Sequence, residues 1–145
     1  MTDGFDRNRA GFLKEDFRQG FIEYCGFEAV KVERGEVESS LKVEDHHRQQ
    51  DGYVHAGVMA TMADHTAGYA GFTSVGDDRR ILTVEFKINF LRPASGDSLR
   101  CRARVLREGR RLLVAEAEVY DVGEEGPVLC AKALMTQIAV VISPG

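Results

Sequence analysis

Hydrophobic and polar residues alternate strictly over residues 82–90, which is the period of a strand with one buried face. Leu, Val, Phe and Ile hold the even positions, Thr83 and the other odd positions are polar, and Pro93 ends the pattern. We therefore expect Thr83 on the polar side of this strand. Similar alternation predicts strands over 30–33, 36–43, 99–105, 113–119 and 128–141.

Two segments have helical periodicity instead. The first has large apolar residues at helical spacing and predicts one amphipathic helix that stops near Gly26: Leu13, Phe17, Phe21 and Tyr24. The second runs from about Ala56 to Gly71 and is so rich in Ala and Gly that a sheet can wrap closely around it. The order of elements predicts an α+β fold, with an antiparallel sheet curled around one central helix and an extra N-terminal helix.

Turn signals separate the strands. Arg34-Gly35 is expected to close the first hairpin, and the turn at 108–110 to close a later one. A three-residue loop there would set Arg102 opposite Glu116 and Arg100 opposite Glu118, which pairs opposite charges across the strands.

Composition narrows the class of protein. The 145 residues suit a single domain over residues 1–145, and the net charge of −4 argues against nucleic-acid binding. No apolar run has the length of a membrane span, and the chain begins without a signal pattern, so no membrane association is expected. Three cysteines without a C-x-x-C pair favour a reduced, cytoplasmic protein.

Metal chemistry is not expected. His46, His47 and His65 are the histidines that invite a metal hypothesis, but their spacing matches no standard zinc motif. We therefore expect neither a metal site nor another cofactor.

The candidate chemistry lies on the central helix. Gly57, at its start, can bring a backbone N–H close to a ligand where the helix dipole favours negative charge. Asp64 is the acidic residue of this small-residue helix and lies about two turns further along. An oxyanion donor and a carboxylate that serves as base or nucleophile are what attack on a carbonyl requires.

The spacing of His55, Gly57 and Asp64, followed by His65-Thr66-Ala67-Gly68-Tyr69-Ala70, resembles the hotdog-fold acyl-CoA thioesterases of the phenylacetate-degradation (PaaI-like) type. The strand 82–94, which ends in Pro93-Ala94, continues the resemblance. The family commonly has His-Gly-Gly where this chain has Ala56 as the middle residue.

The resemblance also implies roles for further residues. Gln49 would hydrogen-bond the thioester carbonyl or the water, Thr83 would hold the attacking water beside Asp64, and His55 would position the site. Gln50 lies beside Gln49, so the sequence leaves open which amide enters the site.

Substrate contacts follow less directly. An acyl pocket for either an aromatic ring or an alkyl chain is expected from four residues of the central helix: Met59, Met62, Tyr69 and Phe72. For the CoA phosphates, Arg92, Arg110 and Arg111 are the candidates because they lie near strand ends.

The expected reaction is hydrolysis of an acyl-CoA thioester to a free acid and CoA. A curled sheet leaves an edge strand uncovered, so we expect a homodimer or homotetramer. The resemblance implies sites shared between subunits, with Gln49, His55 and Gly57 from one and Asp64 and Thr83 from the other.

Two alternatives remain open. A non-catalytic acyl-CoA-binding module would use the same pocket without releasing thiol. A hotdog dehydratase or hydratase would use His55 and Asp64 to move a proton at carbon, although the sequence has neither a His-Phe-Pro motif before the helix nor an Asp and His pair on the loop that leads into it.

Overall fold

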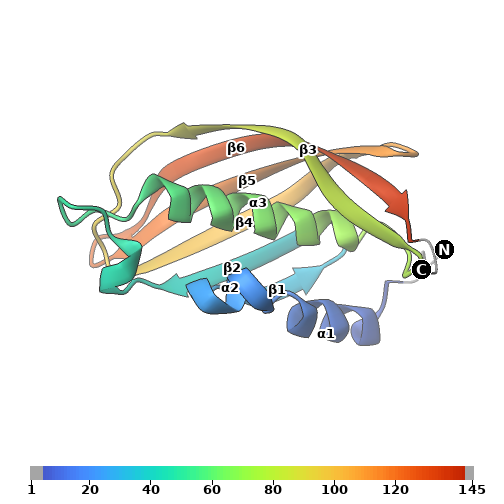
Figure 1. Ribbon diagram of the computed structural model, residues 1–145, viewed down its shortest axis with the longest axis horizontal. Coiled ribbons are helices and arrows are strands. Elements are labelled where there is room, and N and C mark those ends of the chain that lie inside the picture. Colours follow the sequence, from blue (N-terminus) through green and yellow to red (C-terminus); the bar gives the residue numbers. More distant parts are fainter. Residues whose placement is uncertain (1–4, 143–145) are drawn as a thin grey trace.

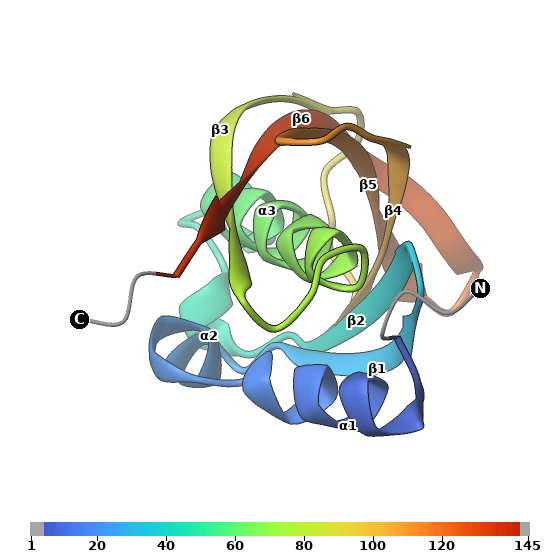
Figure 2. The same cartoon turned by 90° about the vertical axis from the view of Figure 1, so that its right-hand side faces the viewer.

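The computed structural model describes residues 5–142, whose six strands form one antiparallel sheet that curls around helix α3 (Figure 1). The elements are α1 (Arg7–Asp16), α2 (Gly20–Cys25), β1 (Glu28–Glu33), β2 (Glu36–Lys42), the 3-10 turn η1 (Asp45–His47), α3 (Ala56–Phe72), β3 (Arg79–Phe90), β4 (Ser98–Glu108), β5 (Leu112–Gly123) and β6 (Gly126–Val141). The strand order is β1-β2-β4-β5-β6-β3, and Figure 2 shows this sheet as an arc around α3 with β1 and β3 at its ends. The predicted fold class is confirmed.

Helix α3 is buried around much of its circumference, unlike a surface helix with one apolar stripe. Ala63, Ala67 and Ala70 are fully buried, and their small side chains let the strands approach closely. Within residues 5–142, no helix combines the length and apolar composition needed to cross a lipid bilayer.

The predicted N-terminal helix is two helices. Gln19 is extended and Gly20 has a φ of 53°, so the chain turns between α1 and α2. Phe17 is buried against the core, whereas Phe21 is 64% exposed and Tyr24 is 82% exposed. One continuous helix was therefore the wrong prediction, because the apolar spacing crosses a break at the left-handed glycine.

Strand β3 contains a β-bulge at Val84. Thr83 pairs with Gln137 of β6 and Glu85 pairs with the adjacent Thr136, so Val84 is an extra residue in the ladder. A bulge reverses the alternation of faces along the strand that carries it.

The bulge corrects the predicted side of Thr83. Before it, Ile81 and Thr83 face α3, and after it Phe86 packs against the core. Leu82 and Val84, which continue the sequence pattern of Phe86, are each 55% exposed. Thr83 therefore faces α3, although the alternation in the sequence assigns it to the solvent-facing side of the strand.

The hairpin of β4 and β5 also differs from the prediction. Arg104 lies opposite Glu116 and Arg102 opposite Glu118, a shift of two residues from the expected pairs. Strand β4 extends to Glu108, beyond an irregularity after Val105, which moves the turn along the chain. The Arg104 Nε donates to Glu116 Oε1 at 2.6 Å.

Candidate active site

Asp64 and Thr83 meet between α3 and β3. The Thr83 hydroxyl donates to Asp64 Oδ1 at 2.6 Å, and the Asp64 side chain is half-buried. The neighbours on the helix are small, and within residues 5–142 no hydrogen bond engages Oδ2, which leaves that oxygen available to a ligand. The bulge at Val84 is what turns Thr83 toward α3.

His55 caps the start of α3. Its Nδ1 accepts the Gly57 N–H at 2.8 Å, so in the neutral ring Nε2 carries the proton and is a donor. A Cβ on residue 57 would lie 3.0 Å from the same Nδ1, which accounts for glycine here. The Gly57 N–H, expected to be free, is therefore engaged by His55. The N–H of Ala56 has no hydrogen-bond partner within residues 5–142.

A groove of about 570 Å³ opens beside this end of α3. Four of the predicted site residues line it: Gln49, His55, Met59 and Arg92. Gln50 also lines it, so both amides reach the groove. Its large apolar side chains, Tyr53, Phe90 and Leu91, were not among the residues expected from the sequence. The position of Phe90 and Leu91 just before Pro93 is the sequence signal that points to these two.

Gln49 is held by its own loop. Its Oε1 accepts the backbone N–H groups of Asp51 and Tyr53. The Nε2 group has no partner within residues 5–142 and is free to donate to a ligand in the groove.

The predicted catalytic residues thus lie in two places within one chain. His55 and Gln49 are at the start of α3, and Asp64 is nine residues after His55. At 1.5 Å per residue, this separates His55 and Asp64 by about 13 Å along the helix axis. Reacting groups must lie about 3 Å from one carbonyl, so these two cannot act together within one chain.

Some predicted substrate contacts lie elsewhere. Met62 is 1% exposed and belongs to the core, so its predicted place in a substrate pocket is wrong. Tyr69 is also buried, where its hydroxyl donates to Asp16 at 2.7 Å and burial raises its pKa. Arg110 and Arg111 lie in the β4–β5 turn, where the Arg110 carbonyl accepts from Arg79, and neither lines the groove that contains Arg92.

The other histidines have structural partners. His47 Nε2 donates to the Cys25 carbonyl at 2.6 Å, and His65 Nε2 donates to the Phe17 carbonyl at 2.9 Å. Burial lowers the pKa of His65, which favours the neutral ring. Among residues 5–142, no three His, Cys, Asp or Glu side chains form a group able to hold a metal ion.

Known proteins that resemble this chain are thioesterases and CoA hydrolases. The model of the thioesterase superfamily matches residues 51–128, which include Asp64, Gly57 and Thr83. A 1,4-dihydroxy-2-naphthoyl-CoA hydrolase of Listeria monocytogenes is 29% identical over 77% of this chain and 89% of its own length. A protein of the same name from Escherichia coli is 26% identical over 90% of this chain and 86% of its own.

Solved structures give the same result. A thioesterase family protein from Silicibacter pomeroyi superimposes with a TM-score of 0.86 and 34% identity, covering 90% of this chain and 96% of that one. The chain therefore belongs to the thioesterase superfamily and has the hotdog fold of its structural relatives.

Proposed function

We propose that this chain is an acyl-CoA thioesterase of the phenylacetate-degradation type, which hydrolyses a thioester to a free acid and CoA. The observation that carries the proposal is the hydrogen bond of 2.6 Å between Thr83 and Asp64, on the half-buried face of α3. Two relatives are named as CoA hydrolases, which supports CoA thioesters as the substrate class.

Asp64 activates the attack in this proposal. As a general base, its free oxygen takes a proton from water while the water oxygen bonds to the thioester carbon. As a nucleophile, the carboxylate itself bonds to that carbon and water releases the acid afterwards. In both cases the C–S bond breaks and CoA leaves as the thiolate, and Thr83 keeps the carboxylate aligned.

The Gly57 N–H is the proposed oxyanion donor, and this role requires an exchange of acceptors. In the free chain the N–H donates to the neutral His55 Nδ1. A developing oxyanion is a stronger acceptor than a neutral imidazole nitrogen, so it displaces that nitrogen as the attacking oxygen bonds to the thioester carbon. The Nε2 groups of Gln49 and His55 are the further donors placed to orient the carbonyl.

Each site takes groups from two copies of the chain in this proposal, within a homodimer or a larger homo-oligomer. The distance of about 13 Å along α3 supports sharing, because Gln49, His55 and Gly57 must meet Asp64 and Thr83 of another copy. Met59 and Arg92 line the groove and are proposed to contact the substrate, with Arg92 on the CoA side.

The test is thiol release from acyl-CoA substrates by wild type and by Asp64→Asn. The amide keeps the size of the side chain but removes the base or nucleophile, so kcat should fall by about 10² or more. Glu124→Gln, in the exposed β5–β6 turn, is the matched control for loss of one carboxylate. Near-normal turnover by a folded Asp64→Asn protein would contradict the mechanism. Substrate binding by wild type without thiol release would identify a binding module instead.

A further inference from the structure

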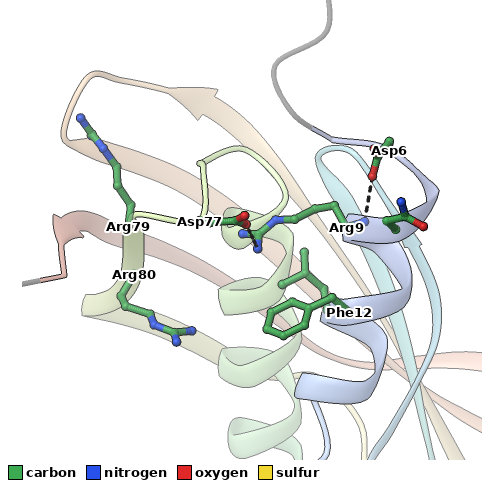
Figure 3. A pocket seen from close by; sticks show the side chains of 8 residues that line it. Asp6, Arg9, Phe12, Asp77, Arg79 and Arg80 are labelled. Carbon is green, nitrogen blue, oxygen red and sulfur yellow. Dashed lines mark hydrogen bonds and ion pairs between the residues drawn. The ribbon is translucent and has the colours of Figure 1, made fainter. Parts of the chain in front are cut away.

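A second cavity lies at the opposite end of α3 from the groove. Its volume is about 400 Å³, and residues of α1, the α3–β3 loop and the start of β3 line it (Figure 3): Asp6, Asn8, Arg9, Phe12, Leu13, Asp77, Arg79 and Arg80. It combines guanidinium groups with the exposed ring of Phe12, a surface suited to an apolar group that ends in an anion.

The arginines of this cavity are not equivalent. Arg9 forms an ion pair with Asp77 at 2.6 Å and also donates to the Phe72 carbonyl at 3.3 Å, so it ties α1 to the end of α3. Arg79 donates to the carbonyl of Arg110 at 3.3 Å.

Arg80 is different because its side chain has neither an ion pair nor a hydrogen bond within residues 5–142. Its guanidinium lies over the Phe72 ring, 5.8 Å from the centroid. Figure 3 shows the Arg80 side chain extending from β3 toward the space beside Phe12. Stacking on Phe72 holds the cation in place while all its N–H groups remain available.

The face of α3 that carries Asp64 leads to this arginine. Asp64, Gly68 and Phe72 are spaced four residues apart and therefore share one face of the helix. On β3, Thr83 contacts Asp64, and Arg80 contacts Phe72. The distance along the axis from Asp64 to Phe72 is about 12 Å.

Gly68 leaves room along this face. A Cβ at residue 68 would meet nothing within 4 Å, although glycine inside a helix costs about 1 kcal/mol relative to alanine. By contrast, the nearby Gly71 is explained by close packing, since a Cβ there would collide with Gln137. Packing within the chain therefore does not explain the glycine at position 68, whereas space for a substrate does.

We propose that Arg80 binds a carboxylate at the far end of the acyl group, so that the preferred substrates are thioesters of dicarboxylic acids. This inference rests on the proposed thioesterase function. The thioester carbon lies at Asp64, the acyl chain passes Gly68 and Phe72, and the terminal carboxylate accepts two N–H groups of Arg80. A guanidinium matches a carboxylate in this bidentate geometry better than an ammonium does.

The CoA portion leaves the site in the other direction. The thioester carbonyl is oriented by the groove at the start of α3 in the neighbouring copy, where Arg92 is exposed. The nucleotide of CoA carries several negative charges, whereas the cavity at the end of α3 offers one guanidinium free of ion pairs and hydrogen bonds and also contains the carboxylates of Asp6 and Asp77. One unpaired guanidinium beside two carboxylates therefore suits a single terminal carboxylate better than the several negative charges of the nucleotide.

The experiment compares two thioesters of equal chain length, octanoyl-CoA and suberoyl-CoA, which differ by the terminal carboxylate. For Arg80→Gln, the ratio of kcat/KM for suberoyl-CoA to that for octanoyl-CoA should fall about 10- to 100-fold, the value of a hydrogen-bonded charge. Arg80→Lys keeps the charge without the bidentate geometry, so its ratio should lie between those of wild type and Arg80→Gln. Arg107→Gln, an exposed arginine of β4, is the matched control and should keep the wild-type ratio.

Equilibrium binding separates this proposal from the proposed function. The dissociation constants of both thioesters are measured with Asp64→Asn alone and combined with Arg80→Gln. A selective loss of suberoyl-CoA affinity supports the Arg80 subsite even if wild type releases no thiol, an outcome that would overturn only the hydrolase assignment. Equal effects on the two thioesters, or none, would overturn the Arg80 subsite and leave hydrolysis untouched.

Discussion

At the scale of single residues, the site depends on hydrogen bonds that fix polar groups before a substrate binds. Thr83 holds one oxygen of Asp64, and His55 holds the Gly57 N–H. Both bonds use side chains whose geometry the backbone determines, at a bulge in one case and at a helix start in the other. In the proposed mechanism the bond to Asp64 lowers the cost of aligning the carboxylate, whereas the bond to His55 must give way to the oxyanion.

Thr83→Ala tests the smaller of these roles. Loss of the hydroxyl frees the Asp64 carboxylate to rotate without removing its charge, so kcat should fall about tenfold, less than for Asp64→Asn. Thr83→Ser keeps the hydroxyl and should restore most of the loss. Both values come from steady-state thiol release. If Thr83→Ala were as damaging as Asp64→Asn, the two residues would have been ranked wrongly.

At the scale of elements, contacts between α3 and the sheet determine where the site residues point. Gln137 of β6 is fully buried and its Nε2 donates to the Ala67 carbonyl of α3 at 2.7 Å. Its neighbour across the ladder is Thr83, so one side chain ties the helix to the strand pair beside the candidate site. Gly71 makes room for this amide, since a Cβ there would lie 2.5 Å from Gln137 Oε1.

Two glycine substitutions should therefore have opposite effects. Gly71→Ala displaces the Gln137 amide from its hydrogen bond and should lower the free energy of unfolding by about 1–3 kcal/mol. Gly11→Ala, in an exposed position of α1 with open space around it, should raise that energy by about 0.5–1 kcal/mol. Denaturant unfolding measures both. In a Gln137→Ala background the cost of Gly71→Ala should shrink, and an undiminished cost would show that Gln137 is not the cause.

At the scale of the whole molecule, one copy does not bring all the proposed catalytic groups to one point. The groove with Gln49 and the pair of Asp64 and Thr83 occupy different parts of α3. Strand β3 is an edge of the sheet, and a second copy paired there would cover it. Assembly and activity are linked in this proposal.

Mixing two inactive variants tests that link. Asp64→Ala and Gln49→Ala are refolded together in equal amounts, after each alone has been found inactive. Half of the dimers should be mixed, and each mixed dimer has one intact site, so roughly a quarter of wild-type activity should return. Refolding the variants separately and then combining them is the control. No recovery would refute shared sites and leave the thioesterase proposal standing.

The sequence alone determined the central helix and the succession of strands along the chain, because periodicity and turn residues act locally. It also singled out Asp64, Gly57 and Thr83, through their spacing and the family resemblance. Only the tertiary structure located the bulge at Val84, because a bulge depends on the partner strand as well as its own residues.

The same physical reason explains the other differences. The register of β4 and β5 follows from where two strands meet in space, and the burial of Met62 follows from a sheet that encloses α3 on several sides. The break before Gly20 and the bond from Gly57 to His55 depend on backbone conformation that apolar spacing does not encode. The local sequence pattern determines the helices and strands, whereas packing between these elements decides the direction in which each side chain points.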